Sequence, residues 1–233
     1  MSTTADRLSD LTAFYSALDR LVRAQGGLRY LRSCDGRKVW PVRGVYFFFE
    51  PGEDRTDTGP GQRVVRVGTH ALTETSRTTL WNRLSQHRGN AGDHGGNHRG
   101  SVFRKHIGGA LMARDTSLEF PHWGNASTAP SDIRLSEQAL ERAVSQVIGA
   151  MPFVVLAVPD APGPDSLRAY VERNCIGLLS NYGRPRLDPA SPEWLGRSCP
   201  ANRIRQSDLW NSQHVEEQHE PDFLMQFDRL VGA

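Results

Sequence analysis

Near the start of the chain, apolar residues recur at helical spacing, and shorter strand-like runs follow. Over residues 4–23 they return every three or four positions, and Gly26-Gly27 supplies a stop signal, so we predict a packing helix here. Apolar residues in 28–33 and 38–42 then flank Asp35-Gly36, a dipeptide that tolerates the positive φ angles of a tight turn. This arrangement predicts a β-hairpin.

Three further apolar runs lack a helical period and predict the buried strands of a sheet. They are residues 45–49, 64–67 and 153–158. The first two are joined by a loop rich in Gly, Asp and Pro, which indicates an antiparallel hairpin. We therefore predict an α/β fold in which a small antiparallel or mixed three-stranded sheet is flanked by helices.

Helical patterns occupy much of the remaining chain, and the whole divides into three parts. The expected helices cover residues 78–87, 101–112, 136–150 with Ser136 as N-cap, a segment capped by Asp165 or Ser166 that ends near 180, and short stretches near 206–215 and 222–230. Residues 89–100 are too rich in glycine for regular structure. We predict an N-terminal helix and hairpin in residues 1–40, a core in 41–182 and a C-terminal extension in 183–233.

The composition is that of an ordinary globular protein. Hydrophobic residues make up 38% and charged residues 23% of the chain, a balance that argues against disorder. No apolar run approaches the ~20 residues of a membrane span, and the first residues lack the order of a signal peptide, so we expect a cytoplasmic protein with no membrane partner. Cys34, Cys175 and Cys199 stand far apart and form no CxxC pair, so we interpret them as structural thiols.

Positive charge is concentrated between residues 77 and 106, where six Arg or Lys residues accompany a single acid, Asp93. Such a block is a candidate surface for phosphate groups, and a solvated basic face explains it equally well. The residues that we consider for nucleic-acid contacts are Arg88, Arg99, Arg104, Lys105 and His106. His94 and His98 lie four apart in this block, but a glycine-rich segment without a nearby cysteine does not favour a zinc site.

One carboxylate shares a helical stripe with apolar residues. Glu172 has Cys175, Ile176 and Leu179 at positions i+3, i+4 and i+7. Because an unpaired buried carboxylate is costly, we expect Glu172 to lie at the edge of this face, to form an ion pair, or to bind a cation. Asn181 follows the helix, where a cap or turn residue is the simplest interpretation.

Four segments occur in an order that resembles the GIY-YIG nuclease family. They are Gly44-Val45-Tyr46, Arg66-Val67-Gly68, a helix over 80–87 that bears Arg83 and His87, and the later helix YVERNCIGLLSN. Each segment alone is common, and their shared order and spacing over residues 42–182 carry the resemblance. The chain departs from the family pattern at Arg66, which stands where the second motif usually has a tyrosine.

The resemblance implies roles for particular residues. Tyr46 would activate or orient the attacking water, and Arg83 would grip the scissile phosphate. Glu172 would hold a single divalent cation, Mg²⁺ or Mn²⁺. Asn181 looks like the polar residue that often follows this glutamate in the family, and we add it to the residues expected to contact nucleic acid.

The residue types suit phosphodiester hydrolysis independently of the family. Mg²⁺ typically keeps most of its waters and uses one or two protein carboxylates, so a single glutamate is enough. An arginine fork matches phosphate bidentately, so Arg83 is one candidate for this contact and Arg104 is another. The resemblance further implies that Arg66 replaces a hydroxyl contact with a charge directed at phosphate. His87 and His106 occupy places where members of the family vary, and the resemblance implies that either would assist proton transfer.

We therefore expect a metal-dependent endonuclease that acts on DNA, and the residues do not separate DNA from RNA. Cutting both strands with one active site per chain would favour a homodimer. One alternative is a nucleic-acid-binding module that keeps the scaffold and has lost its chemistry together with the motif tyrosine. Another is a structural or toxin–antitoxin-like interaction protein whose basic block meets an acidic partner.

Overall fold

A computed structural model describes residues 3–90, 92–93 and 95–232, and its centre is a four-stranded antiparallel sheet. The strands are β1 (Arg29–Tyr30), β2 (Gly44–Asp54), β3 (Gln62–Gly68) and β4 (Pro152–Ala157), in the order β1-β4-β2-β3. Strand β2 pairs with two neighbours, so that Tyr46 lies opposite Gly68 on one side and Val155 on the other. Strand β3 is consequently an edge of the sheet.

The sheet has four strands and not the three that we predicted, because β1 adds to its other edge. Tyr30 pairs with Pro152 of β4, whereas the hairpin expected about Asp35-Gly36 does not form and residues 38–42 contain no strand. A strand of two residues is too short to leave a hydrophobic period in the sequence. The prediction that residues 28–33 and 38–42 pair with each other is therefore wrong.

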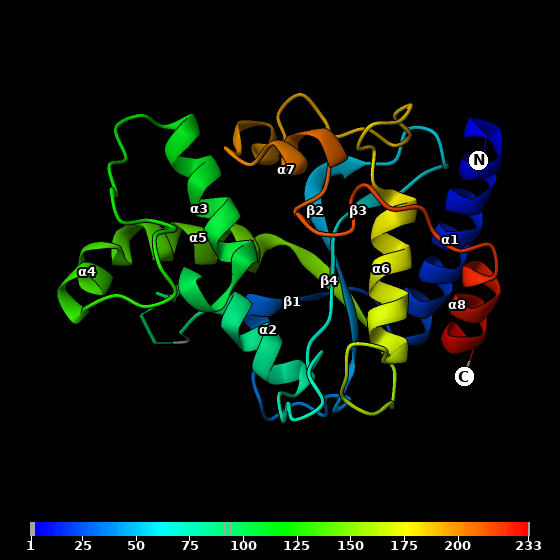
Figure 1. Cartoon of the computed structure of the whole chain (residues 1–233), viewed down its shortest axis with the longest axis horizontal. Coiled ribbons are helices and arrows are strands. Elements are labelled where there is room, and N and C mark those ends of the chain that lie inside the picture. Colours follow the sequence, from blue (N-terminus) through cyan, green and yellow to red (C-terminus); the bar gives the residue numbers. More distant parts are fainter. Residues whose placement is uncertain (1–2, 91, 94, 233) are drawn as a thin grey trace.

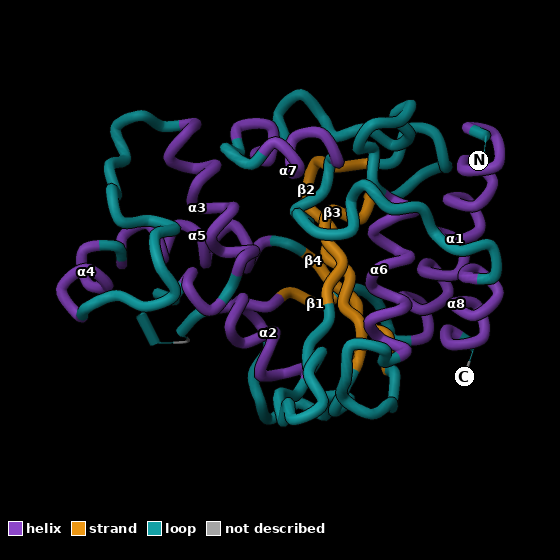
Figure 2. Tube along the Cα trace, viewed as in Figure 1, coloured by secondary structure: helices purple, strands orange, loops and turns teal. Residues whose placement is uncertain are grey.

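Helices cover both faces of the sheet and give three layers (Figures 1 and 2). One face carries α1 (Thr4–Ala24), α6 (Leu167–Leu179) and α8 (Phe223–Val231), and the other carries α2 (Leu80–Arg88), α3 (Val102–Arg114) and α5 (Gln138–Ala150). The connecting segments hold the short helices α4 (Ser131–Ser136), α7 (Asn202–Ser207), η1 (Leu31–Ser33), η2 (His98–Gly100) and η3 (Leu195–Ser198). None of the helices in the described ranges has the length and apolar character needed to cross a membrane.

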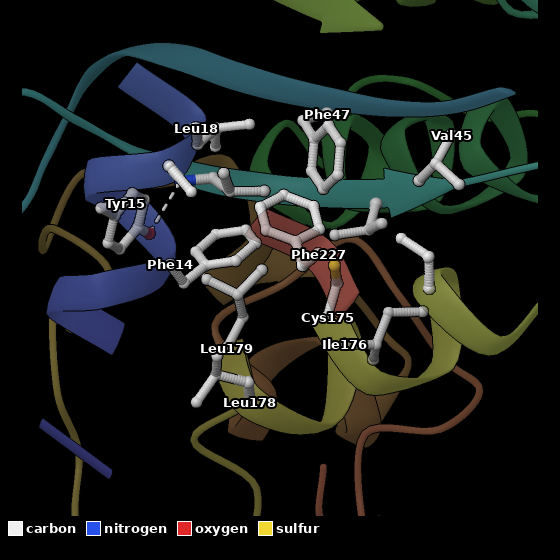
Figure 3. Packing of buried hydrophobic residues seen from close by; sticks show 14 of the residues in the cluster. Phe14, Tyr15, Leu18, Val45, Phe47, Cys175, Ile176, Leu178, Leu179 and Phe227 are labelled. Atoms are coloured by element: carbon white, nitrogen blue, oxygen red, sulfur yellow. Dashed lines mark hydrogen bonds between the residues drawn. The ribbon is translucent and has the colours of Figure 1, made fainter. Parts of the chain in front are cut away.

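Strand β2 sends alternate side chains into two hydrophobic cores. Val45 and Phe47 belong to the core beneath α1, α6 and α8, where the ring of Phe47 lies near those of Phe14 and Phe227 (Figure 3). Tyr46 belongs to the opposite core, beneath α2, α3 and α5. The alternation of the strand thus directs a phenol group toward the helices that follow β3 in the chain.

Side-chain caps fix where two helices important for the site begin. Thr79 Oγ1 accepts a hydrogen bond from Asn82 N at the start of α2, and Ser166 caps α6, as one of the two predicted caps. The predicted helix that begins at Ser136 is wrong at its start, because Ser136 ends α4 and α5 begins at Gln138.

The C-terminal segment folds against the sheet. Trp194 and Trp210 are buried, and both indole N–H groups donate to Glu50 Oε2 at 3.0 Å. The backbone N–H of Trp210 also donates to Val65 O at 2.7 Å. Residues around 210 therefore run beside the edge strand β3.

Two predicted helices of this segment had opposite outcomes. The helix near 222–230 is confirmed as α8, and the helix over 206–215 is wrong because α7 ends at Ser207. Asp208 then adopts the left-handed conformation, with φ 59°, which ends the helix.

Candidate active site

The glycines of the two motif-like segments allow close packing between strands. A Cβ atom at Gly68 would lie 2.2 Å from the Tyr46 hydroxyl oxygen, and one at Gly44 would lie 2.3 Å from Leu156 O. Both distances are far below van der Waals contact, so neither position accepts a side chain. Glycine at position 68 lets the Tyr46 ring lie across the end of β3.

A hydrogen-bonded chain joins Tyr46 to α2 and to the start of α3. The Tyr46 hydroxyl oxygen lies 2.8 Å from His87 Nε2, and His87 Nδ1 lies 2.8 Å from Ser101 Oγ. Burial lowers the pKa of His87 well below its ordinary value, and the charges of Arg83 and Arg66 add to this effect. We assign the single imidazole proton to Nδ1, so that Nε2 accepts the hydrogen bond from Tyr46.

Arg66 stands on β3 beside Tyr46 and is buried. Its Nη1 donates to Trp210 O at 2.6 Å, and its guanidinium carbon lies 4.7 Å from the centre of the Phe103 ring. Burial lowers the pKa of Arg66, and the nearby Tyr46 opposes that shift. Its Nε has no hydrogen-bond partner among the described residues, and none of their acids forms an ion pair with it. The site therefore contains a buried cation without a counter-ion from those residues.

Arg83 lies one helical turn before His87 on α2, in a partly exposed position. Its Nη1 donates to Gln86 Oε1 at 3.0 Å and to Gly100 O at 3.1 Å. No acid in the part of the chain that the structure describes forms an ion pair with Arg83. Its positive charge adds to the lowering of the pKa of His87 and opposes the rise in the pKa of Glu172.

Glu172 approaches the same end of β3 from α6, on the opposite face of the sheet. Its Oε1 accepts a hydrogen bond from Thr69 N at 3.2 Å, directly after the strand. Burial raises the pKa of the Glu172 carboxyl, and the charge of Arg66 opposes this rise. The carboxylate is partly buried, lines a cavity of about 300 Å³, and has no ion-pair partner within residues 3–90, 92–93 and 95–232.

These donors fit a hydrated hard cation better than a metal enclosed by protein ligands. Among the described residues, no group of three or more His, Cys, Asp or Glu side chains is arranged to hold a metal ion. Mg²⁺ and Mn²⁺ take oxygen ligands, and Mg²⁺ is commonly bound through one or two carboxylates with water completing its shell. A partly desolvated, unpaired carboxylate that opens onto a cavity supplies such a ligand. Glu172 therefore fits this cation.

Two arginines of the basic block form internal ion pairs. Arg104 is fully buried, and its Nε and Nη2 donate to Glu141 Oε2 at 2.9 and 2.6 Å. Arg99 donates to both carboxylate oxygens of Glu137 at 2.6 and 2.9 Å, and its side chain is only 3% exposed. Their charge is neutralised inside the fold. We therefore correct the expectation that Arg99 and Arg104 contact nucleic acid.

Arg88, Lys105 and His106 are the other members of the basic block, and they differ in exposure. Arg88 donates from Nη1 to Cys34 O at 2.5 Å, and its guanidinium carbon lies 5.2 Å from the centre of the Trp81 ring. Lys105 is exposed. His106 is partly buried, and burial lowers its pKa to about 4, with Arg66 adding to the effect. Of the three, Lys105 has the most accessible charge.

Asn181 lies in the interior and has structural partners. Its Oδ1 accepts hydrogen bonds from Arg7 Nη2 and Leu187 N, each at 3.0 Å. Its Nδ2 donates to Asp208 Oδ2 at 2.9 Å and to Leu187 O at 3.1 Å. A buried amide with four internal hydrogen bonds is not free to contact nucleic acid, so the role predicted for Asn181 needs the same correction.

His98 also has structural partners. Its Nδ1 lies 2.9 Å from Glu141 Oε1, and its Nε2 accepts a hydrogen bond from Gly124 N at 3.0 Å. Both ring nitrogens are thus occupied within the fold. His94, four residues earlier, lies outside the described residues.

Two histidines outside the predicted set border the site. His70 follows Gly68 by two residues, with its Nδ1 2.9 Å from Thr78 O, and burial lowers its pKa to about 4. His214, in the C-terminal segment, shares the 300 Å³ cavity with Glu172. The position of His70 just after the second motif is a signal visible in the sequence. His214 lies far from both motifs and has no such signal.

A comparison with protein-family models gave a match over nearly the whole chain. The model that matches is described as a GIY-YIG domain, and it covers residues 5–233. It thus includes the N-terminal helix and the C-terminal segment as well as the region 42–182 that carries the motif order. A search of curated proteins gave no match, and neither did a search of solved structures.

Proposed function

Because the chain belongs to the GIY-YIG family of nuclease domains, we propose that it is an endonuclease that hydrolyses phosphodiester bonds in DNA. Nucleases of this family act on nucleic acids and generally depend on a divalent metal ion. The observation that carries the proposal is that Tyr46 lies opposite Gly68, the last residue of β3, while Glu172 accepts a hydrogen bond from Thr69 N directly after that strand. Arg66 stands on the same strand, and Arg83 lies one helical turn before His87 on α2. In the described part of the chain, no ion pair neutralises these charged groups.

Tyr46 and His87 provide the route for the proton of the attacking water. The neutral His87 accepts the hydrogen bond of the buried Tyr46 hydroxyl, so the tyrosine oxygen can accept a proton as it passes its own to His87. As the water attacks phosphorus, its proton passes to the Tyr46 oxygen and the phenolic proton passes to His87 Nε2. The hydrogen bond between His87 Nδ1 and Ser101 Oγ holds the imidazole in the tautomer that this transfer needs.

The two arginines counter the charge that develops on the phosphate. Arg83 is partly exposed and matches the bidentate geometry of a phosphate group, so it contacts the scissile phosphate. Arg66 is buried and fixed by Trp210 O, so it contributes a preorganised positive charge behind the site. Removal of one preorganised donor of this kind typically costs about 3–4 kcal/mol of transition-state stabilisation.

Glu172 is the residue that would hold the divalent cation. When bound there, the cation supplies Lewis-acid stabilisation to the phosphate oxygen and to the leaving oxygen. The hydrogen bond from Thr69 N fixes one carboxylate oxygen of Glu172, so the carboxylate keeps its direction toward the cavity. Lys105 and Arg88 lie outside this centre and are our remaining candidates for contacts with the flanking DNA backbone.

The proposal is tested by cleavage of supercoiled plasmid and of a branched oligonucleotide with Mg²⁺, with Mn²⁺ and with a chelator. We expect nicking or linearisation that requires metal and is lost in Glu172→Ala. Glu119→Ala removes the same charge from an exposed position and should cleave like wild type. Intact substrate for the wild-type protein under every condition, together with retarded DNA in a gel shift, would support a binding module instead.

A further inference from the structure

The segment that follows Trp210 advances along the edge strand β3 toward Glu172. Trp210 N donates to Val65 O, and the Asn211 amide makes two hydrogen bonds with the backbone of Val67, at 3.1 and 2.8 Å. Contacts therefore move toward the end of the strand as the segment proceeds. The segment then reaches His214, which lines the same cavity as Glu172.

His214 is held in a defined position at the end of this segment. Its backbone has the left-handed φ of 61°, which few residues other than glycine adopt. The next residue, Val215, accepts a hydrogen bond at its carbonyl from Ser180 Oγ at 2.5 Å. With Asn211 fixed on one side and Val215 on the other, His214 has little freedom to move away from its place.

The His214 side chain has one ring nitrogen occupied, and the other has no hydrogen-bond partner within the described part of the chain. Its Nδ1 lies 2.6 Å from Glu217 Oε1, and the side chain is 35% exposed. A carboxylate acceptor fixes the imidazole proton on Nδ1 and leaves the Nε2 lone pair available. Histidines that bind metals usually have this arrangement, in which the second nitrogen donates to a carboxylate that orients the ring.

We propose that His214 is a second protein ligand, through Nε2, of the divalent cation held by Glu172. Both side chains line the same cavity of about 300 Å³, and they reach it from different elements, α6 and the segment after α7. The inference rests on the proposed function, because it concerns the same cation. Glu217 is then a positioning residue, since it acts on the cation only through the orientation of the His214 ring.

A carboxylate and an imidazole with water at the remaining positions make an open site. Two protein ligands agree with the absence, among the described residues, of any larger group of metal-binding side chains. Water completes the shell, so positions stay open for phosphate oxygens. This arrangement also gives the C-terminal segment a function in the active site, beyond covering the edge of β3.

The test is direct measurement of Mn²⁺ binding to the whole chain in the absence of DNA. Electron paramagnetic resonance counts free Mn²⁺, and its pulsed form detects coupling of bound Mn²⁺ to a ligand ¹⁴N nucleus. We expect one Mn²⁺ per chain with ¹⁴N coupling in the wild type, and loss of binding in Glu172→Ala. His214→Gly should weaken binding at least about 10-fold and remove the ¹⁴N coupling, and Glu217→Gln should weaken it several-fold.

The variants are chosen so that misfolding does not decide the result. Glycine accepts the left-handed backbone at position 214, so His214→Gly keeps the segment in place, and the ¹⁴N coupling is measured on unmodified protein. His122→Ala removes an exposed histidine and should bind Mn²⁺ like wild type. Binding that depends on Glu172 but lacks ¹⁴N coupling would overturn the role of His214 alone. Failure of the wild type to bind Mn²⁺ would overturn both this inference and the proposed metal site.

Discussion

Arg83 and Arg104 both come from the basic stretch of residues 77–106, yet their environments differ. Arg104 is fully buried and paired with Glu141. Arg83 has no acidic partner among the described residues and donates only to an amide and a carbonyl group. A charge that is already neutralised holds the fold together, whereas an unneutralised one is available to an anionic substrate.

The same contrast explains what the loop between α2 and α3 does. Arg99 pairs with Glu137, while His98 and Arg104 share Glu141. These bonds tie the glycine-rich loop to the helices α4 and α5 and thereby fix the start of α3. Ser101, at that start, is the residue that orients His87. The ion pairs of Arg99 and Arg104 therefore support the part of the structure that orients His87.

The largest effect on stability should come from breaking the ion pair between Arg104 and Glu141. Arg104→Ala leaves the buried Glu141 carboxylate without its main counter-ion, which should lower the free energy of unfolding by about 3–5 kcal/mol. Urea denaturation followed by circular dichroism measures this value. The double variant Arg104→Met with Glu141→Leu removes both charges and should recover much of the loss. A change below about 1 kcal/mol in Arg104→Ala would show that the pair does not stabilise the fold.

Removing Arg83, which has no ion pair among the described residues, should affect DNA cleavage strongly and stability only slightly. Arg83→Ala should lower the rate of DNA cleavage about 10²–10³-fold, because a preorganised phosphate contact is lost. Its free energy of unfolding should change by no more than about 0.5 kcal/mol, since the side chain is partly exposed. Single-turnover cleavage and urea denaturation give the two numbers. Arg134→Ala, at an exposed position on α4, is the control, and equal rates for both variants would remove Arg83 from the site.

Tyr46→Phe should separate the contribution of the Tyr46–His87 hydrogen bond to DNA cleavage from its contribution to stability. Loss of the hydroxyl should reduce the cleavage rate about 10²-fold, within the usual range for proton transfer by a side chain. It also leaves His87 Nε2 buried without a donor, which should cost about 1–3 kcal/mol of stability. Tyr30→Phe, at an exposed tyrosine, should change neither quantity. A Tyr46→Phe protein that cleaves at the wild-type rate would assign water activation to another group.

The smallest effect concerns pH and the partly buried histidine His106. Its pKa falls from 6.5 to about 4 in the fold, so the unfolded chain binds the proton more tightly. The stability that neutral His106 contributes is complete above pH 6.5 and is lost as the pH falls from 6.5 toward about 4. At pH 5.5 the loss should be about 1 kcal/mol.

Comparison with His106→Gln isolates this contribution from that of other titrating groups. Urea denaturation between pH 7.5 and 5 should show a shallower decline in stability for the variant than for wild type. Parallel pH profiles for the two proteins would show that His106 is not the group responsible.

The sequence predicted the parts of the fold that depend on local patterns. Runs of apolar residues predicted β2, β3 and β4 because buried strands need them, and Ser166 was one of two candidate caps for α6. Strand β1 is two residues long and pairs with β4 far away in the chain, so no local pattern predicts it. The helix over 206–215 was wrong because the segment is held by contacts with β3 rather than by helical bonds.

The family pattern supplied the order of the candidate site residues, and their roles remain predictions. Tyr46 and Glu172 come from separate elements, β2 and α6, and the structure brings both to the end of β3. The buried ion pair of Arg104 was not predictable, because its partner Glu141 lies 37 positions away and no local spacing links the two. The position of His214 beside Glu172 depends on the path of the C-terminal segment along β3, which only the folded chain shows.

The most direct test of the central claim compares DNA binding and DNA cleavage in one variant, Glu172→Gln. The substitution keeps the size of the side chain and removes its charge, so the surface that meets DNA stays nearly unchanged. We predict that Glu172→Gln retards plasmid DNA in a gel shift like wild type and fails to cleave it with either Mg²⁺ or Mn²⁺. Metal-dependent cleavage at the wild-type rate by Glu172→Gln would contradict the placement of the catalytic cation at the end of β3.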